Sequence, residues 1–217
     1  MNKQVAVILS GCGTEDGSEA REVILTLLGL DQRGIGYRCF APDGDQPRVV
    51  DHRSGEAYDA TRNVLREAAR LGGRETLDLA ALDPDDVDGV VIPGGVGVIH
   101  TLSDFATAGT EMSVLPQLRD ALVPFHERGK PFGLMGYAPL LVPRLLGEGI
   151  AVTVGQNAEL AGAISSMGGL HKSCAVNEVA IDREHRVVST PAFLLAGGPA
   201  EASTGIFKLI DRLAEML

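Results

Sequence analysis

The chain has 217 residues, of which 45% are hydrophobic and 22% charged, so it is long and apolar enough to bury a core. Acidic residues outnumber basic ones by 29 to 19 and Trp is absent, which argues against nucleic acid as a partner. Its cysteines, Cys12, Cys39 and Cys174, are too few and too scattered for a disulfide framework or a four-ligand zinc site, and indicate a reducing compartment.

No stretch of the sequence has the pattern of a targeting or membrane segment. The apolar run near the first residues is shorter than that of a signal peptide, and no uncharged stretch reaches the roughly 20 apolar residues of a bilayer span. We therefore expect a cytoplasmic protein that has no membrane partner.

Short apolar runs alternate with helical periodicity along the whole chain. In chain order, strands are predicted at residues 5–9, 37–40, 89–92, 130–135, 151–154, 176–181 and 186–189. Helices are predicted after the turn at 10–18 and at residues 63–71, 115–128, 138–146, 158–167 and 206–213. A hairpin is expected within 45–59, and 96–113 is predicted to be a long irregular loop. With no linker or repeat, residues 1–217 are predicted to form one α/β domain with helices on both faces of a mostly parallel sheet.

The first helix begins with acidic residues whose role the spacing leaves open. Asp16 and Glu19 have the spacing of a capping box, so Glu19 could cap the helix together with Asp16. Glu19 also follows a strand end, where burial would raise its pKa and suit it to general acid/base catalysis, and the two roles are compatible. The helix is predicted to bury an apolar stripe made of Val23, Leu27 and Leu30, widened by Ile24 and Leu28.

Sites in such sheets form beyond the carboxyl ends of the strands, where the turns at residues 10–17, 93–97 and 135–139 are expected. Gly11 and Gly13 hint at a phosphate cradle, but the neighbouring acids favour a plain tight turn. The turn that contains Gly94 and Gly95 is either a plain turn or a source of backbone N–H groups for an oxyanion hole.

The third turn has the form of a nucleophile elbow, in which a strained residue joins a buried strand to a helix. Gly136 holds that position and offers no nucleophile. Cys12 is predicted to be either a reactive thiol near a helix start or, as the favoured interpretation, a small buried hydrophobe. His100 lies in the long loop as a candidate for proton transfer, and no spacing of His or acidic residues predicts a metal site.

These turns, taken in order, resemble the ElbB family, whose members are described as enhancing-lycopene-biosynthesis proteins and as glyoxalase ElbB. The resemblance covers essentially the whole chain and rests on residues 8–13, 16–19, 40–43, 62–65, 93–97, 102–106 and 189–193. It places the chain in the class I glutamine-amidotransferase-like superfamily, with the PfpI proteases. It implies a flavodoxin-like three-layer α/β sandwich, often dimeric.

The resemblance also implies a chemistry. The family's reaction is a cofactor-free conversion of a 2-oxoaldehyde to a 2-hydroxy acid, in which an elbow cysteine adds to the aldehyde and a glutamate moves a proton between carbons. By motif the glutamate corresponds to Glu19, the oxyanion donors to the N–H groups of Gly95 and Tyr137, and the elbow cysteine to Gly136. The loop after the second turn departs from the family as well, with Val96, His100 and Thr101 at positions where phenylalanine, lysine and asparagine are common.

Three hypotheses follow, because losing a covalent nucleophile usually removes several orders of magnitude of rate. The first is a divergent cofactor-free enzyme for a small carbonyl metabolite, with Glu19 as general acid/base and His100 or Cys12 as a second proton-transfer group. The second is an inactive metabolite-binding or regulatory protein. The third, and the least favoured, is a residual glyoxalase that uses Cys12. A homodimer is expected from the resemblance alone.

Overall fold

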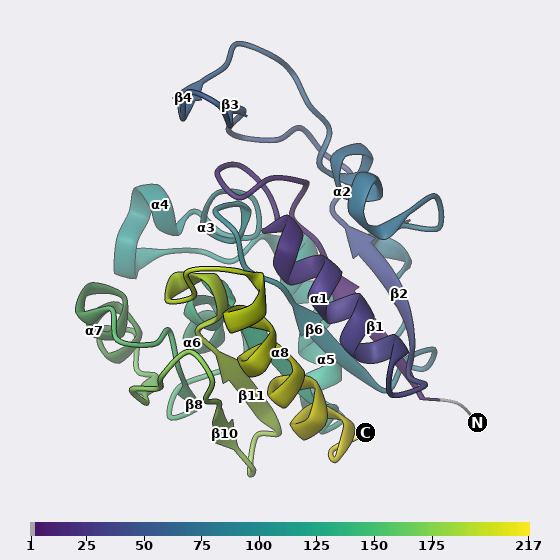
Figure 1. Cartoon of the computed structure of the whole chain (residues 1–217), viewed down its shortest axis with the longest axis vertical. Coiled ribbons are helices and arrows are strands. Elements are labelled where there is room, and N and C mark those ends of the chain that lie inside the picture. Colours follow the sequence, from purple (N-terminus) through teal and green to yellow (C-terminus); the bar gives the residue numbers. More distant parts are fainter. Residues whose placement is uncertain (1–2) are drawn as a thin grey trace.

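A seven-stranded sheet forms the centre of the computed structural model, which describes residues 3–217 (Figure 1). The strand order is β10-β11-β7-β6-β1-β2-β5, and every pair is parallel except β10 with β11. The strands are β1 (Gln4–Ile8), β2 (Gly36–Ala41), β5 (Leu77–Asp78), β6 (Gly89–Ile92), β7 (Phe132–Met135), β10 (Ala180–Asp182) and β11 (Val187–Thr190). The predicted mostly parallel sheet is confirmed.

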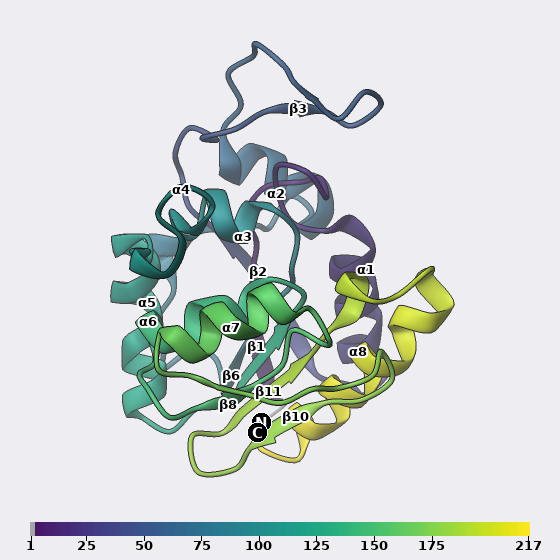
Figure 2. The same cartoon turned by 90° about the vertical axis from the view of Figure 1, so that its left-hand side faces the viewer.

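Helices cover both faces of this sheet, as Figure 2 shows for α1 and α8 on one side and α5 and α6 on the other. One face carries α1 (Ala20–Asp31), α2 (Val64–Gly72) and α8 (Pro199–Ala214), and the other α5 (Pro116–Glu127), α6 (Val142–Leu145) and α7 (Ala158–Ser166). Alternate residues of β1 point to opposite faces of the sheet. Val5 and Val7 pack in the core under α1, α2 and α8, and Ala6 and Ile8 in the core under α5, α6 and α7. The flavodoxin-like three-layer sandwich is therefore confirmed.

Several predicted boundaries were wrong, mainly in segments held by tertiary contacts. The loop predicted at 96–113 contains the short helices α3 (Gly97–His100) and α4 (Phe105–Ala108) and a 3-10 turn at Gly109–Glu111. The helix predicted at 138–146 begins as a 3-10 turn, Ala138–Leu141, before α6. The strand predicted at 151–154 shortens to β8 (Ala151–Val152), which pairs with β9 (Leu170–His171) in a separate two-stranded sheet. The strand predicted at 176–181 is limited to β10.

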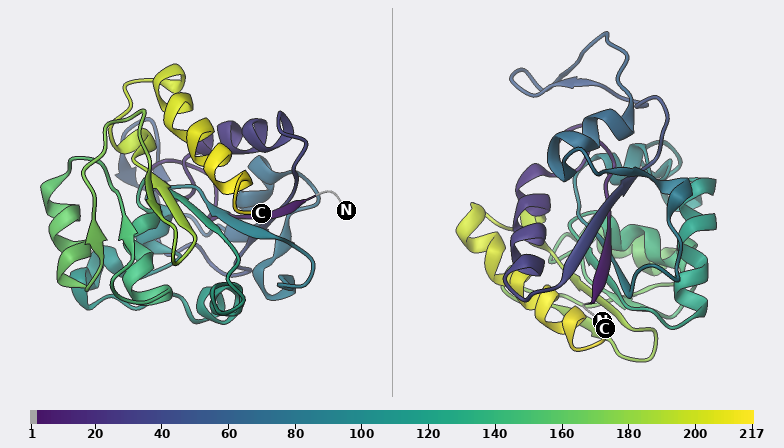
Figure 3. Two further views of the ribbon diagram at one scale, coloured as in Figure 1. Left: turned by 90° about the horizontal axis from the view of Figure 1, so that it is seen from below. Right: turned by 90° about the vertical axis from the view of Figure 1, so that its right-hand side faces the viewer.

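The hairpin predicted within 45–59 is present as β3 (Val50–Asp51) and β4 (Glu56–Ala57). It projects from the body beyond the carboxyl end of β2 (Figure 1), whereas α8 ends at the opposite end of the sheet, beside the start of β1 (Figure 3). Further 3-10 turns span Leu79–Ala81 and Ala192–Leu194. No helix in the described part of the chain is long and apolar enough to cross a membrane.

Candidate functional site

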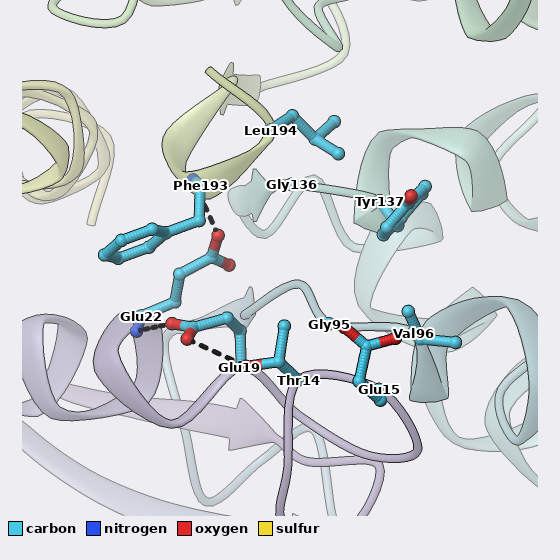
Figure 4. A pocket seen from close by; sticks show the side chains of 10 residues that line it. All are labelled: Thr14, Glu15, Glu19, Glu22, Gly95, Val96, Gly136, Tyr137, Phe193 and Leu194. Carbon is cyan, nitrogen blue, oxygen red and sulfur yellow. Dashed lines mark hydrogen bonds between the residues drawn. The ribbon is translucent and has the colours of Figure 1, made fainter. Parts of the chain in front are cut away.

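A pocket of about 210 Å³ opens at the carboxyl ends of the central strands (Figure 4). The predicted turns after β1, β6 and β7 meet there, joined by the 3-10 turn after β11. Backbone hydrogen bonds fix the first two turns to each other: the Val96 N–H donates to Thr14 O at 2.9 Å, and the Gly97 N–H to Gly17 O at 2.9 Å. The lining residues are Thr14, Glu15, Glu19, Glu22, Gly95, Val96, Gly136, Tyr137, Phe193 and Leu194.

The elbow after β7 has the backbone form that the sequence predicted. Gly136 has φ +59°, in the left-handed region, and its N–H donates to Thr190 O at 3.2 Å. A Cβ added at this position would lie 3.1 Å from the Gly94 Cα and 3.2 and 3.3 Å from the carboxylate oxygens of Glu22. Any side chain placed on the elbow would therefore contact Glu22.

Glu22 is the functional candidate that sequence reasoning missed. Its side chain is buried, with Oε2 accepting from the Gly94 N–H at 2.6 Å and Oε1 from the Phe193 N–H at 3.0 Å. Burial raises the pKa of this carboxyl to about 7, helped by the nearby charge of Glu19 and opposed by the two amide hydrogen bonds and by Arg21. A carboxyl that titrates near neutrality inside a pocket can both accept and donate a proton at physiological pH.

Glu19 lies one helical turn before Glu22 and is the N-cap of α1. Its Oε2 accepts from the Glu22 N–H at 2.7 Å, and its Oε1 accepts from the Thr14 hydroxyl at 3.1 Å and from Arg21 Nε at 2.6 Å. The capping box predicted with Asp16 was wrong: Asp16 points to the hairpin, where its Oδ2 accepts from the Val50 N–H at 2.8 Å. Glu19 lines the pocket, and its carboxyl is held by the helix-cap bond from Glu22 and by the side-chain bonds from Thr14 and Arg21.

Backbone N–H groups at two of the turns are free to bind an oxygen atom of a ligand. Among residues 3–217, the N–H groups of Gly95 and Tyr137 donate to no protein acceptor, and both residues line the pocket. Gly95 and Tyr137 are the two residues that the family resemblance implied as oxyanion donors. Gly94 differs, because its N–H already holds Glu22 and is not available to a substrate.

Gly95 is expected to tolerate no side chain. It has φ +103°, and an added Cβ would lie 2.3 Å from Gly17 O and 2.4 Å from the Glu19 N. We expect Gly95→Ala to lower the free energy of unfolding by more than about 2 kcal/mol, from strained backbone and overpacking together. Chemical denaturation measures this loss, and Gly109→Ala is the matched control, because its φ of +56° is also positive but no atom lies within 4 Å of its added Cβ. Equal losses in the two variants would show that the contacts around Gly95 matter little.

The other two predicted catalytic residues lie outside this pocket. Burial, with the charge of Glu67 next, raises the pKa of the half-buried Cys12 thiol, opposite to what a reactive thiolate needs. His100 ends α3 and lines a separate cavity with Thr101 and Ser103, and burial and the neighbouring Arg48 lower its pKa. The structure thus brings Glu19, Gly95, Gly136 and Tyr137 together, without Cys12 and His100.

The sheet order and the elbow are those of the class I glutamine-amidotransferase-like fold. No family model matches the chain. The human glutamine amidotransferase-like class 1 domain-containing protein 3, mitochondrial, is 36% identical over 223 residues, which cover 98% of this chain and 83% of the human protein. The chain belongs to the family of glutamine amidotransferase-like class 1 domain proteins.

Solved structures agree with this assignment. An isoprenoid biosynthesis protein with amidotransferase-like domain from Ehrlichia chaffeensis has a TM-score of 0.91 and 33% identity, over 99% of this chain and all of that one. Glyoxalase III from Candida albicans has a TM-score of 0.63 at 12% identity, over 99% of this chain and 98% of that chain, and so shares the fold. The human relative is named as mitochondrial, so the comparisons do not support the predicted cytoplasmic location. The homodimer stays a prediction.

Proposed function

We propose that the chain is an ElbB-like protein that acts, without a cofactor or an elbow nucleophile, as an enzyme on a small carbonyl metabolite. The observation that carries the proposal is the position of Glu22, a buried carboxyl with a pKa near 7 placed directly against the bare elbow. General acid/base catalysis needs only a carboxyl of this kind and a means of polarising the carbonyl group.

The proposed reaction is proton transfer next to a carbonyl group. The substrate oxygen accepts from the N–H groups of Gly95 and Tyr137, which would stabilise the negative charge that develops on it. The Glu22 carboxylate removes a proton from the adjacent carbon, and the electron pair of that C–H bond moves toward the carbonyl to give an enediolate or enolate. Glu22 then returns a proton to the same carbon, which regenerates the substrate with exchange of its hydrogen. In a 2-hydroxy carbonyl substrate, Glu22 can instead protonate the former carbonyl carbon while the hydroxyl proton moves to the former carbonyl oxygen, so that atoms and charge balance without any covalent bond to the protein.

This assignment moves the acid/base role predicted for Glu19 to Glu22. Glu19 accepts three hydrogen bonds, from the helix N-terminus, a threonine hydroxyl and an arginine, which together hold its side chain in one position. Glu22 is the group whose pKa is about 7 and whose oxygens face the elbow. Glu19 therefore serves by capping α1 and orienting Glu22.

The hypothesis of an inactive binding protein predicts the same pocket but no chemistry, and deuterium exchange separates the two. Methylglyoxal, hydroxyacetone and glyceraldehyde would be incubated with the protein in deuterated water, and loss of the proton signals next to each carbonyl followed by NMR. We expect exchange with at least one compound at a rate that scales with protein concentration. Saturable binding of a compound with no exchange in any of them would instead support a metabolite-binding protein.

The residual glyoxalase that uses Cys12 finds no support in this geometry. The thiol lies outside the pocket lining, and burial raises its pKa, so that little thiolate forms at neutral pH. If methylglyoxal is converted at all, we expect Cys12→Ala to convert it as well as the natural protein.

A further inference from the structure

The Glu22 carboxyl is held by segments that lie far apart in the sequence. One oxygen accepts from the Gly94 N–H in the turn after β6, and the other from the Phe193 N–H in the 3-10 turn after β11. Figure 4 shows Glu22 between Phe193 and Glu19. The turn that contains Gly94 is fixed to α1 by a backbone bond from the Glu19 N–H to Gly94 O at 2.9 Å. Among residues 3–217, no backbone–backbone hydrogen bond joins the Phe193 segment to α1.

Arg21 provides a side-chain link between α1 and that segment. Its Nε donates to Glu19 Oε1 at 2.6 Å, and its guanidinium carbon lies 3.8 Å from the centre of the Phe193 ring. The Arg21 side chain is 49% exposed and that of Glu19 only 3%, so the guanidinium closes over a buried carboxylate from the solvent side. An arginine stacked on an aromatic ring and paired with a carboxylate is restrained in both position and plane.

We propose that Arg21 is a positioning residue that clamps the Phe193 segment and Glu19 together and thereby fixes the carboxyl of Glu22. The contacts form a closed circuit: Arg21 binds Glu19, Glu19 caps the Glu22 N–H, Glu22 accepts from the Phe193 N–H, and the Phe193 ring stacks on Arg21. The inference rests on the proposed function for its importance to catalysis, but the circuit can be tested in the resting protein.

Removing Arg21 is expected to change the titration of Glu22 in one direction. Its positive charge, which favours ionised Glu22, is lost, and the negative charge of Glu19 is left uncompensated. The Phe193 N–H, no longer held by the stacked ring, donates less well to the carboxylate. All three changes disfavour the ionised form, so the pKa of Glu22 rises.

The experiment follows the carboxyl carbon of Glu22 by NMR in protein labelled with ¹³C-glutamate, with the signal assigned by its absence in Glu22→Gln. In Arg21→Ala we expect the Glu22 titration midpoint to rise by at least about half a pH unit. Arg21→Lys keeps the positive charge but loses the planar group that stacks on Phe193, so the Glu22 midpoint should rise less in this variant. If the exchange reaction is present, its rate at pH 7 should fall in Arg21→Ala while the apparent KM holds, because less Glu22 is ionised.

Arg33→Ala is the matched control. Arg33 is paired with Asp211 at 2.6 Å and lies 5.7 Å from the Phe207 ring centre, so it makes the same kinds of contact beyond the far end of α1. We expect no change in the Glu22 titration in this variant. An unchanged Glu22 midpoint in Arg21→Ala, or equal shifts in both arginine variants, would overturn the inference. Absence of carbonyl exchange in the natural protein would overturn the proposed function alone, because the titration requires no substrate.

Discussion

Glu22→Gln is expected to reduce carbonyl-adjacent proton exchange by about 10²–10⁴-fold, the usual contribution of a positioned acid or base. The amide of glutamine cannot take up the proton that the reaction must move. The substitution keeps the volume of the side chain, so that the pocket stays closed around the elbow. The measurement is the NMR exchange rate at saturating substrate, compared with the natural protein at the same pH.

Glu19→Gln is the matched control for this loss. A glutamine at the N-cap can still accept from the Glu22 N–H through its amide oxygen, so α1 stays capped. We expect Glu19→Gln to retain most of the exchange activity, with the deficit arising from a weaker bond to Arg21. If Glu19→Gln were inactive and Glu22→Gln active, the proton-transfer role would return to Glu19, where the sequence pattern placed it.

The same carboxyl also makes stability depend on pH. The pKa of Glu22 is about 7 in the folded chain against an ordinary value of 4.5, so the folded state binds this proton more tightly than the unfolded state does. Its stabilising contribution is fully present below pH 4.5 and is lost as pH rises through 7, a change of about 3 kcal/mol. Exchange activity should rise over the upper part of this range, because the ionised form is the base.

Chemical denaturation of the natural protein and Glu22→Gln at pH 5 and pH 8 tests this linkage. Glutamine has one acceptor oxygen for two N–H donors, so the variant should be less stable at both values, by roughly 1–3 kcal/mol from the unpaired donor. The deficit should be larger at pH 5 than at pH 8. A deficit that is independent of pH would contradict the raised pKa of Glu22.

Our proposal places the acid/base role at Glu22, one turn later than the predicted Glu19, and spacing alone could not fix the start of α1, which separates the two residues. Asp16 and Glu19 are three residues apart, and so are Glu19 and Glu22, so either pair fits a capping pattern. Tertiary contacts determine which acid caps the helix. Asp16 accepts a hydrogen bond from the hairpin, so Glu19 is the N-cap of α1 and Glu22 lies inside its first turn.

The predicted apolar stripe of α1 was correct for Val23 and Leu30, which are buried, and for Leu27, which is partly buried against the same core, but its widening to Ile24 and Leu28 was wrong. Ile24 and Leu28 are 52% and 42% exposed, and the buried face consists of Glu22, Val23, Thr26, Gly29 and Leu30. Gly29 allows α8 to approach closely, since an added Cβ would lie 3.2 Å from the Phe207 ring. Glu22, Thr26 and Gly29 recur at helical spacing and so share the buried face of α1. The sequence prediction gave more weight to the large apolar side chains, which lie partly on another face.

The fold was easier to predict than the site, because buried parallel strands carry their signal in continuous apolar runs. All residues of β6 and β7 are buried, and both were predicted from such runs. The turns that follow them were also predicted, since Gly94, Gly95 and Gly136 mark where the backbone must bend. Which side chains point into the space between the turns depends on helix rotation, which local sequence does not determine.

Gly136→Cys is expected to convert methylglyoxal to lactate much faster than the natural protein does. The introduced Cβ would lie 3.2 and 3.3 Å from the Glu22 oxygens, so the thiol and the carboxyl would be neighbours, beside the free N–H groups of Gly95 and Tyr137. A thiolate could then add to the aldehyde carbon, and Glu22 could move the proton from that carbon to the next. Hydrolysis of the resulting thioester by water would give lactate and regenerate the thiol.

The substitution has a structural cost that its control must share. A side chain at φ +59° is strained by roughly 1–2 kcal/mol, and the new Cβ would lie only 3.1 Å from the Gly94 Cα. Gly136→Ala carries the same strain without the thiol, and should be as destabilised in chemical denaturation while converting no methylglyoxal. Lactate formation is the measurement for both variants. If Gly136→Cys folds as well as Gly136→Ala and forms no lactate, the pocket differs from a glyoxalase site by more than the missing thiol. Its substrate would then be a carbonyl compound for which proton transfer by Glu22 is sufficient.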